Sequence, residues 1–172
     1  MAERLRIALI HGDGIGVDVS ESAKAVTSLA AQRAGAPILD FEPIQAGAVY
    51  YSETGHDIEP GGEERAGEMD AIFLGAIGLP HVRHEDGTEI APHLRLRDRF
   101  GLYAGVRPVR PYPNVPRRLA DPRADGIDLV VLRESTEGLF YSAATHHRNQ
   151  VHDNDVVCDT LRITRGTTEK LH

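Results

Sequence analysis

A short apolar run that ends in a cluster of glycines constrains the fold of this 172-residue chain more than any other feature. Residues 5–10 are apolar except for Arg6 and lead into HGDGIG, a pattern typical of a buried strand followed by a tight turn. We expect a helix from about Asp18, capped by Asp18 or Ser20, and a second strand over residues 38–41. One apolar stripe runs along that helix: Val19, Ala23, Val26 and Ala30. This order of strand, helix and strand predicts the α/β fold class with a largely parallel sheet.

The glycine spacing of the first turn disfavours a dinucleotide-binding fingerprint. The motif G-x-G-x-x-G requires its third glycine at position 17, where this chain has Val17. Instead, Gly12, Gly14 and Gly16 form the pattern G-x-G-x-G. The alternative is a turn that needs glycines for its backbone conformation and that a ligand approaches closely.

Later stretches continue the alternation of strands and helices. Residues 70–77, DAIFLGAI, predict a buried strand that ends in the glycine turn GAIGLP, and ligands of open α/β sheets bind at such carboxyl ends. Further expected elements are a short acidic helix over 63–69, a helix over 91–100, and strands over 103–109, 127–132 and 156–164. Near the end of the chain, Thr167 or Thr168 looks like a helix cap that no helix follows.

Composition and charge exclude several classes of function. A net charge of -7 argues against nucleic acid as the main partner. The single cysteine, Cys158, rules out an intramolecular disulfide and fits a reducing compartment. Because no apolar run is long enough to span a membrane and no signal peptide is evident, we expect a cytoplasmic protein with no membrane partner. His81 and His84 lack companion ligands, which favours a solvated loop over a metal site.

An arginine-rich stretch over residues 94–110, LRLRDRFGLYAGVRPVR, indicates an anion site. It places Arg97 at the end of the expected helix and Arg107 on the next strand, and Arg133 follows a later strand in VVLRESTEG. Converging guanidinium groups suit bidentate capture of carboxylates or phosphates. Four residues share one face of the expected helix, at spacings of three, four and seven from the first: Ile90, His93, Leu94 and Arg97.

Four motifs occur in the order HGDGIG, GAIG, LRLRDRFGLYAGVRPVRPYP and DLVVLRESTEG. Together they resemble the β-decarboxylating dehydrogenases, the family of isocitrate, 3-isopropylmalate, homoisocitrate and tartrate/D-malate dehydrogenases. The resemblance implies an isopropylmalate-dehydrogenase-like α/β fold of two domains with a mixed sheet, here incomplete. It also implies that residues 1–102 are the N-terminal part of the larger, cofactor-side domain, and that residues 103–172 are part of the second, substrate and dimerisation domain.

The resemblance further implies a reaction. A malate-like 2-hydroxy dicarboxylic acid, of the tartrate, D-malate, isopropylmalate or isocitrate type, would be oxidised by NAD or NADP with Mg²⁺ or Mn²⁺ and would then lose carbon dioxide. The family's substrate arginines match Arg97, Arg107 and Arg133. The positions that line the nicotinamide half of the cofactor match Ile15, Gly75, Ile77 and Gly78.

The choice of acid stays open at this point. The family distinguishes the substrate's substituent by a helix surface that matches Ile90, His93 and Leu94. The small hydroxyl residue and asparagine of the isocitrate type are absent, since Ala91 and His93 stand there. The acidic residue of the isopropylmalate type is replaced by Ile90. His93 raises the possibility of a polar substituent such as a hydroxyl.

Two departures from the family pattern concern catalysis. The family's proton-donating tyrosine, seven residues after the arginine matched by Arg133, is Phe140 here, and a phenyl ring cannot donate a proton. Either Tyr141 is turned into the site, or water or another group acts, or decarboxylation is impaired. Family members are also much longer, and their catalytic lysine and metal-binding aspartates lie in the later half. We therefore expect a truncated chain, without metal ligands of its own, that is inactive alone and homodimeric when full length.

Two functions of other classes remain as alternatives. A natural short protein could keep the arginines to bind a dicarboxylate without chemistry. Alternatively, the polar segment over residues 141–164, which in the family forms part of the subunit contact, could make the chain a dimerising module.

Overall fold

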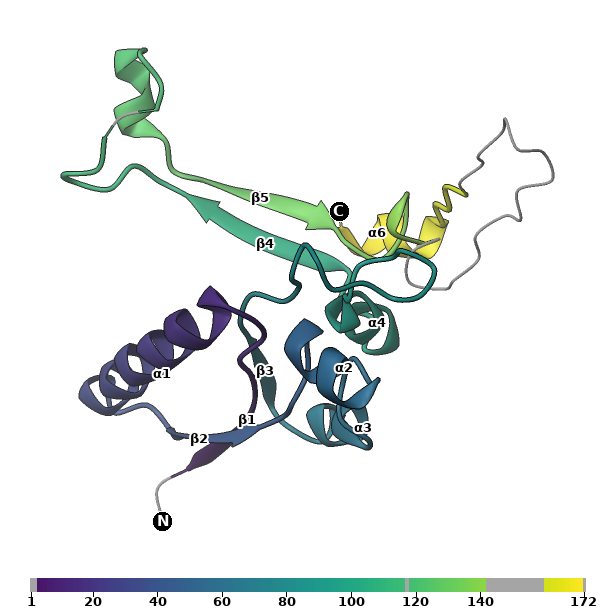
Figure 1. Cartoon of the computed structure of the whole chain (residues 1–172). Coiled ribbons are helices and arrows are strands. Elements are labelled where there is room, and N and C mark those ends of the chain that lie inside the picture. The colour runs from purple at the N-terminus through teal and green to yellow at the C-terminus, as the bar shows by residue number, and fades with distance from the viewer. Residues whose placement is uncertain (1–2, 117, 142–159, 172) are drawn as a thin grey trace. The chain divides into compact units, whose positions relative to one another are not determined.

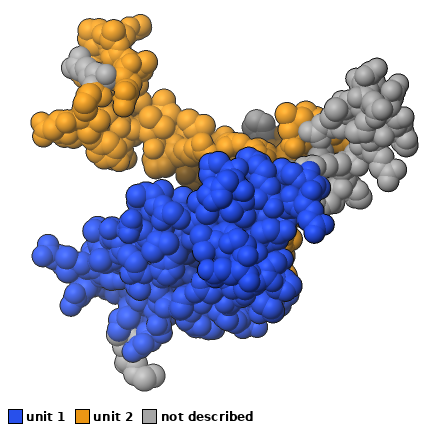
Figure 2. All heavy atoms as spheres, in the orientation of Figure 1, with its two compact units in different colours: residues 1–93 blue, residues 94–172 orange. Residues whose placement is uncertain are grey.

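The computed structural model describes residues 3–116, 118–141 and 160–171, which fall into two units. Unit 1 comprises residues 1–93 and unit 2 residues 94–172 (Figure 2). The division lies inside a helix, between His93 and Leu94, whereas the two predicted domains meet at residues 102 and 103. Those domains refer to the whole protein, so the domain boundary stays a prediction.

A three-stranded parallel sheet forms the centre of unit 1 (Figure 1). Its strand order is β2-β1-β3, with β1 Arg4–Ile10, β2 Ile38–Pro43 and β3 Ala71–Leu74. The last four residues of the central strand are buried because sheet and helices cover them, as the apolar run predicted. The α/β class is confirmed. Strand β3 is shorter than the predicted 70–77, since the backbone turns at Gly75, whose N–H still bonds to the Ile10 carbonyl.

Helix α1, Ile15–Ala34, begins three residues earlier than predicted. Its N-cap is Gly14, so neither Asp18 nor Ser20 caps it; Asp18 lies in the first turn. The predicted stripe is present, but Val19 and Val26 are 48% and 68% exposed, so within the described residues it is not core.

Three shorter helices follow α1. They are α2 Ala48–Thr54, α3 Gly62–Gly67 and α4 Pro92–Arg99. Helices α3 and α4 match the predicted acidic helix and arginine-bearing helix to within a few residues. No helix was predicted over 48–54, because the side chain that caps α2 comes from a distant part of the chain.

That side chain is Asp13, which is 4% exposed and joins three segments of unit 1. Its carboxylate accepts hydrogen bonds from the N–H groups of Ala48 and Val49, both at 2.8 Å, and of Gly78, at 2.7 Å. Its own N–H donates to the Ala76 carbonyl at 2.7 Å. The carboxylate satisfies two donors at the start of α2, where an anion is favourable. It thereby fixes the turn after β1, the start of α2 and the loop after β3 together.

Unit 2 contains an antiparallel ribbon of two strands, β4 Ala104–Val109 and β5 Leu129–Glu134 (Figure 1). Both strands were predicted, and β5 is shifted by two residues so that it includes Arg133. A short 3₁₀ helix, η1 Pro122–Gly126, lies between them in the chain. Within the described residues the parallel and antiparallel strands form separate sheets, so the mixed sheet stays a prediction for the whole protein.

The end of the chain differs from its prediction. Of the predicted strand over 156–164, residues 160–164 are described and make one bridge, between Arg162 and Gly138; residues 156–159 lie outside the described residues. A helix does follow, α6 Arg165–Leu171. Its first turn is bonded to Thr164, whose hydroxyl oxygen accepts from the Thr167 N–H at 3.3 Å. The cap was therefore predicted three or four residues too late.

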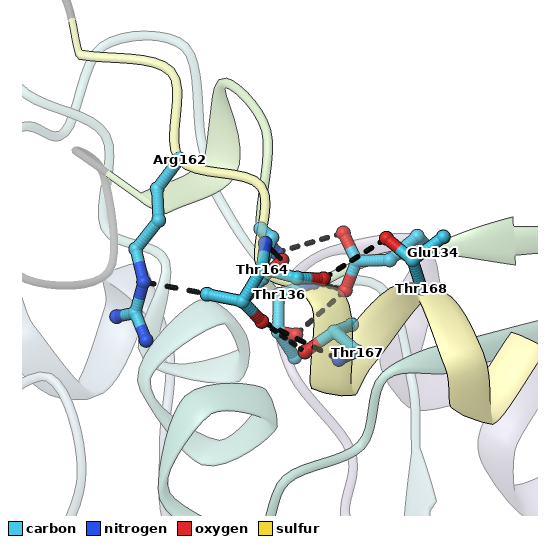
Figure 3. A network of polar contacts seen from close by, with 7 residues as sticks. Glu134, Thr136, Arg162, Thr164, Thr167 and Thr168 are labelled. Carbon is cyan, nitrogen blue, oxygen red and sulfur yellow. Dashed lines mark hydrogen bonds and ion pairs between the residues drawn. The ribbon is translucent and has the colours of Figure 1, made fainter.

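Two glutamates and several threonines form a hydrogen-bond network at the end of β5, and Glu137 ties the segment after β5 to the start of α6 (Figure 3). Glu134 accepts from the N–H and hydroxyl of Thr136 at 2.7 and 2.6 Å. Glu137, 8% exposed, accepts from the N–H and hydroxyl of Thr164, both at 2.7 Å. Burial is the largest influence on Glu137 and raises its pKa, but these hydrogen bonds, with Thr167 and Arg162, outweigh it, so the pKa of Glu137 lies below its ordinary value.

We expect the substitution Asp13→Asn to destabilise the chain by about 2–4 kcal/mol, because an amide loses the charge and turns a donor toward buried N–H groups. Urea unfolding followed by circular dichroism measures the change. The control is Asp18→Asn, an exposed carboxylate in the first turn of α1, which should cost less than about 1 kcal/mol. Equal losses for the two variants would contradict the role assigned to Asp13.

The Glu137 network should make unit 2 sensitive to acid. A lowered folded-state pKa contributes stability that is fully present above the unfolded pKa of about 4.3 and is lost as pH falls through the folded value. Thr164→Val removes one donor and should raise the pKa of Glu137, so that this stability is lost at higher pH. Thr164→Ser keeps the hydroxyl and should match the wild type. A side-chain carboxyl titration by NMR measures the pKa, and the same value in all three proteins would refute the assignment.

Candidate functional site

Two of the three predicted clamp arginines share one face of the β4–β5 ribbon. Gly105 pairs directly with Arg133, and Arg107 lies two residues further along β4. Residues directly opposite each other in an antiparallel pair point to the same face, and so do residues two apart on one strand. Arg107 and Arg133 are therefore diagonal neighbours, with a typical spacing of about 7–8 Å for such pairs. Both side chains are exposed.

Neither of these two arginines forms an ion pair within the parts of the chain that the structure describes. Arg133 instead packs its guanidinium against the Phe140 ring, 4.7 Å from the ring centroid. Arg110, one residue beyond β4, is 3.6 Å from the Asp128 carboxylate and is thus engaged within the protein. The face of Arg107 and Arg133 consequently presents two cations whose charge the described residues leave unneutralised.

The third arginine, Arg97, lies in the last turn of α4 and is half-buried. Its carbonyl accepts the Leu102 N–H at 2.8 Å, which closes the helix before β4 begins. The described contacts include none between the Arg97 guanidinium and the ribbon, so its part in the clamp stays a prediction.

Unit 1 contains a pocket of about 220 Å³ that brings together residues from two of the predicted groups. The cofactor-side residues Ile77 and Gly78 and the substituent-side residues Ile90 and His93 all line it. Ile90 does not lie on the helix, however: it precedes α4 and is 1% exposed, so the predicted face of four helical residues is wrong at that position. Leu94 belongs to unit 2 and does not line the pocket.

Two charged residues of this pocket, Arg83 and Glu89, were not among the predicted site residues. They are bridged as an antiparallel pair, and their side chains approach to 3.4 Å. This pairing closes the loop over 84–88 at both ends. His84 in this loop is half-buried and packs edge-on against Tyr51, with ring centroids 4.9 Å apart, whereas His81 and residues 85–87 are exposed. In the described part of the chain no three His, Cys, Asp or Glu residues form a metal-binding group.

The glycines near the first turn mainly allow two loops to pack together. A Cβ on Gly12 would collide with the Ala76 carbonyl, and one on Gly75 with the His11 carbonyl and the Ser20 hydroxyl. Positive φ angles at Gly12 and Gly14 confirm that the turn needs glycines for its backbone. Gly78 differs, because the nearest atom to its added Cβ would be 3.8 Å away. Ile15 is 66% exposed beside this turn.

A hydrogen-bonded pair at the first turn was also not predicted. The His11 Nε2 lies 2.6 Å from a carboxylate oxygen of Glu21, the seventh residue of α1. The hydrogen bond from His11 is the main reason that the pKa of Glu21 lies below its ordinary value, with smaller contributions from Lys24. The spacing of ten residues across a turn gives no periodic signal by which sequence alone could pair them.

Phe140 and Tyr141, the two candidates at the predicted proton-donor position, contact different arginines. The Phe140 ring lies against Arg133, whereas the Tyr141 ring lies 4.9 Å from the guanidinium of Arg162. Neither residue is part of β5, which ends at Glu134, so strand alternation does not decide their directions. A catalytic role for Tyr141 stays a prediction.

Comparisons with known proteins agree on the family. Residues 6–172 match the isocitrate/isopropylmalate dehydrogenase family. The chain is 35% identical over 172 residues to D-malate dehydrogenase [decarboxylating] of Escherichia coli K12, covering 99% of this chain and 47% of that protein. It is 40% identical over 139 residues to 3-isopropylmalate dehydrogenase of Thermobifida fusca, covering 81% and 39% respectively.

A solved structure supports the same assignment. The apo form of a β-decarboxylating dehydrogenase from Thermococcus kodakarensis aligns with a TM-score of 0.64 and 27% identity, over 97% of this chain and 43% of that one. The chain thus spans less than half the length of these relatives. No helix among the described residues is long and apolar enough to cross a membrane. By the extent of the family match and the order of its motifs, the chain belongs to the isocitrate/isopropylmalate dehydrogenase family.

Proposed function

We propose that this chain supplies the substrate-carboxylate clamp of an NAD(P)-dependent β-decarboxylating dehydrogenase that acts on a malate-like 2-hydroxy dicarboxylic acid. The observation that carries the proposal is the placement of Arg107 and Arg133 on one face of the β4–β5 ribbon, with no ion pair to the described residues. Two diagonal guanidiniums can each hold one carboxylate in bidentate fashion. Arg97 is proposed as the third member.

The lining of the small pocket, rather than overall similarity, favours the D-malate or tartrate type of acid. Relatives named D-malate dehydrogenase, tartrate dehydrogenase/decarboxylase and 3-isopropylmalate dehydrogenase all match almost the whole chain, at 35%, 32% and 32% identity. The pocket beside Ile90 and His93 suits a compact, polar substituent better than a branched alkyl group. The pocket lining includes Arg83 and Glu89, and covering these charged groups with an alkyl substituent of the substrate would be unfavourable.

The residues near the first turn fit the nicotinamide end of NAD or NADP. Ile15 offers an exposed apolar side chain. Gly78 has no Cβ and leaves a space in which the nicotinamide ring could lie. NAD or NADP bound here would supply the hydride acceptor for oxidation of the substrate's hydroxyl-bearing carbon. We assign Ile15, Gly75, Ile77 and Gly78 to holding it. Mg²⁺ or Mn²⁺, a cytoplasmic location and a homodimer are further parts of the proposal for the whole protein.

A substrate panel tests the function on the whole protein. D-malate, tartrate, 3-isopropylmalate and isocitrate are each supplied with NAD or NADP and with Mg²⁺ or Mn²⁺, and reduced cofactor is followed by absorbance. We expect turnover with D-malate or tartrate by a protein of the relatives' full length and none by the 172-residue chain alone. Turnover by the chain alone would refute the expected inactivity, and no turnover of any acid by the longer protein would refute the proposed reaction.

Replacing either ribbon arginine by lysine should weaken dicarboxylate binding to the 172-residue chain about tenfold or more, because an ammonium cannot form the paired contacts of a planar guanidinium. Titration calorimetry with D-malate at low salt measures the dissociation constants of Arg107→Lys and Arg133→Lys. The matched control is Arg110→Lys, which alters an arginine already engaged with Asp128 and should bind like the wild type. Equal affinities for all three variants would contradict the clamp.

A further inference from the structure

Phe140 cannot donate a proton, but its contact with Arg133 suggests a different role for it. The guanidinium carbon of Arg133 lies 4.7 Å from the centroid of the Phe140 ring. A cation at that distance over a ring face is attracted by the ring's quadrupole. This stacking restrains a long side chain that would otherwise be free to sample many rotamers.

The position of the ring is itself fixed by the chain around it. The Phe140 N–H donates to the Glu137 carbonyl, and Gly138, with a φ of +65°, turns the chain just before the ring. Gly138 is bonded in both directions to Arg162, and Glu137 is held by Thr164. The Phe140 ring therefore follows a turn whose residues, Glu137 and Gly138, are hydrogen-bonded to Thr164 and Arg162.

Stacking leaves the arginine able to bind an anion. A guanidinium carries five N–H donors spread over three nitrogens, so a ring on one side of it leaves donors that an anion can still reach. A carboxylate can then form two parallel hydrogen bonds at the edge of a group whose orientation is already set. Pre-orientation lowers the entropy that binding would otherwise lose.

We propose that Phe140 is a positioning residue that holds the Arg133 guanidinium ready for a substrate carboxylate through the face of its ring. The proposal rests on the proposed dicarboxylate function and adds to it a reason for an aromatic residue at this position. What matters at position 140 is then a π face, whether or not it carries a hydroxyl. Phe140→Tyr and Phe140→Trp should keep the effect, whereas Phe140→Leu should lose it at nearly unchanged apolar volume.

The test combines binding with a readout that needs no ligand. Titration calorimetry with D-malate on the 172-residue chain should give a dissociation constant about three- to tenfold higher for Phe140→Leu than for the wild type, with Phe140→Tyr and Phe140→Trp restored to within about twofold. In the ligand-free proteins, the Arg133 side-chain NMR signals should carry a ring-current shift that disappears in Phe140→Leu. The control Phe41→Leu removes an equivalent ring from unit 1, where Lys24 lies 5.9 Å from it, and should change neither readout.

The outcomes separate this inference from the function on which it rests. If the wild type binds D-malate and Phe140→Leu binds equally well with unmoved Arg133 signals, the positioning role is refuted. If the wild type and both aromatic variants show the ring-current shift but none of them binds D-malate, tartrate, 3-isopropylmalate or isocitrate, the contact stands and the proposed function falls. If Phe140→Leu unfolds, the comparison of the Tyr and Trp variants with the wild type decides, since a tenfold loss in both would overturn the role.

Discussion

A single buried carboxylate holds unit 1 together at the point where three of its segments meet. The Asp13 carboxylate accepts hydrogen bonds from two N–H groups at the start of α2 and from the Gly78 N–H. The Asp13 N–H donates to the Ala76 carbonyl. Because a buried carboxylate is costly unless its oxygens are satisfied, each of these contacts depends on the others. The pocket residue Gly78 thus has its place fixed by a side chain that lies 65 residues away in the chain.

Unit 2 depends on a different constraint, the register of two strands. Gly105 pairs with Arg133, and Arg107 lies two residues after Gly105 on β4, so Arg107 and Arg133 lie on the same face. A slip of one residue would send Arg107 to the other face and separate the two cations. The turn after β5 then adds the Phe140 ring under Arg133, and the hydrogen bonds of Glu137 to Thr164 fix that turn. Backbone pairing thus brings Arg107 and Arg133 to one face, and the Glu137 network fixes the turn that places Phe140 against Arg133.

Local pattern was sufficient to predict most of the fold, including the two strands that carry Arg107 and Arg133. The strand around Ile7, the parallel sheet and the arginine-bearing strands follow from apolar runs and their order. Helix α2 was missed because its capping group is Asp13, far away in sequence, and Ile90 was misplaced because the helix starts only at Pro92. The stacking of Arg133 on Phe140 depends on a turn at Gly138, which no periodicity reveals. The miss at α2 thus reflects two distant segments that jointly determine the geometry, whereas the misplacement of Ile90 reflects a local error in where a helix begins.

The ribbon that displays two arginines on one face exposes hydrocarbon on the other. Val106, Val130 and Leu132 alternate with the arginine face by the strand register, and all three side chains are exposed. Salt acts on the two faces in opposite directions: it screens the attraction of guanidinium for carboxylate, while strongly hydrated anions such as sulfate strengthen contacts between apolar surfaces. In concentrated sulfate, the acid binding proposed above should weaken while the tendency of the chain to self-associate rises.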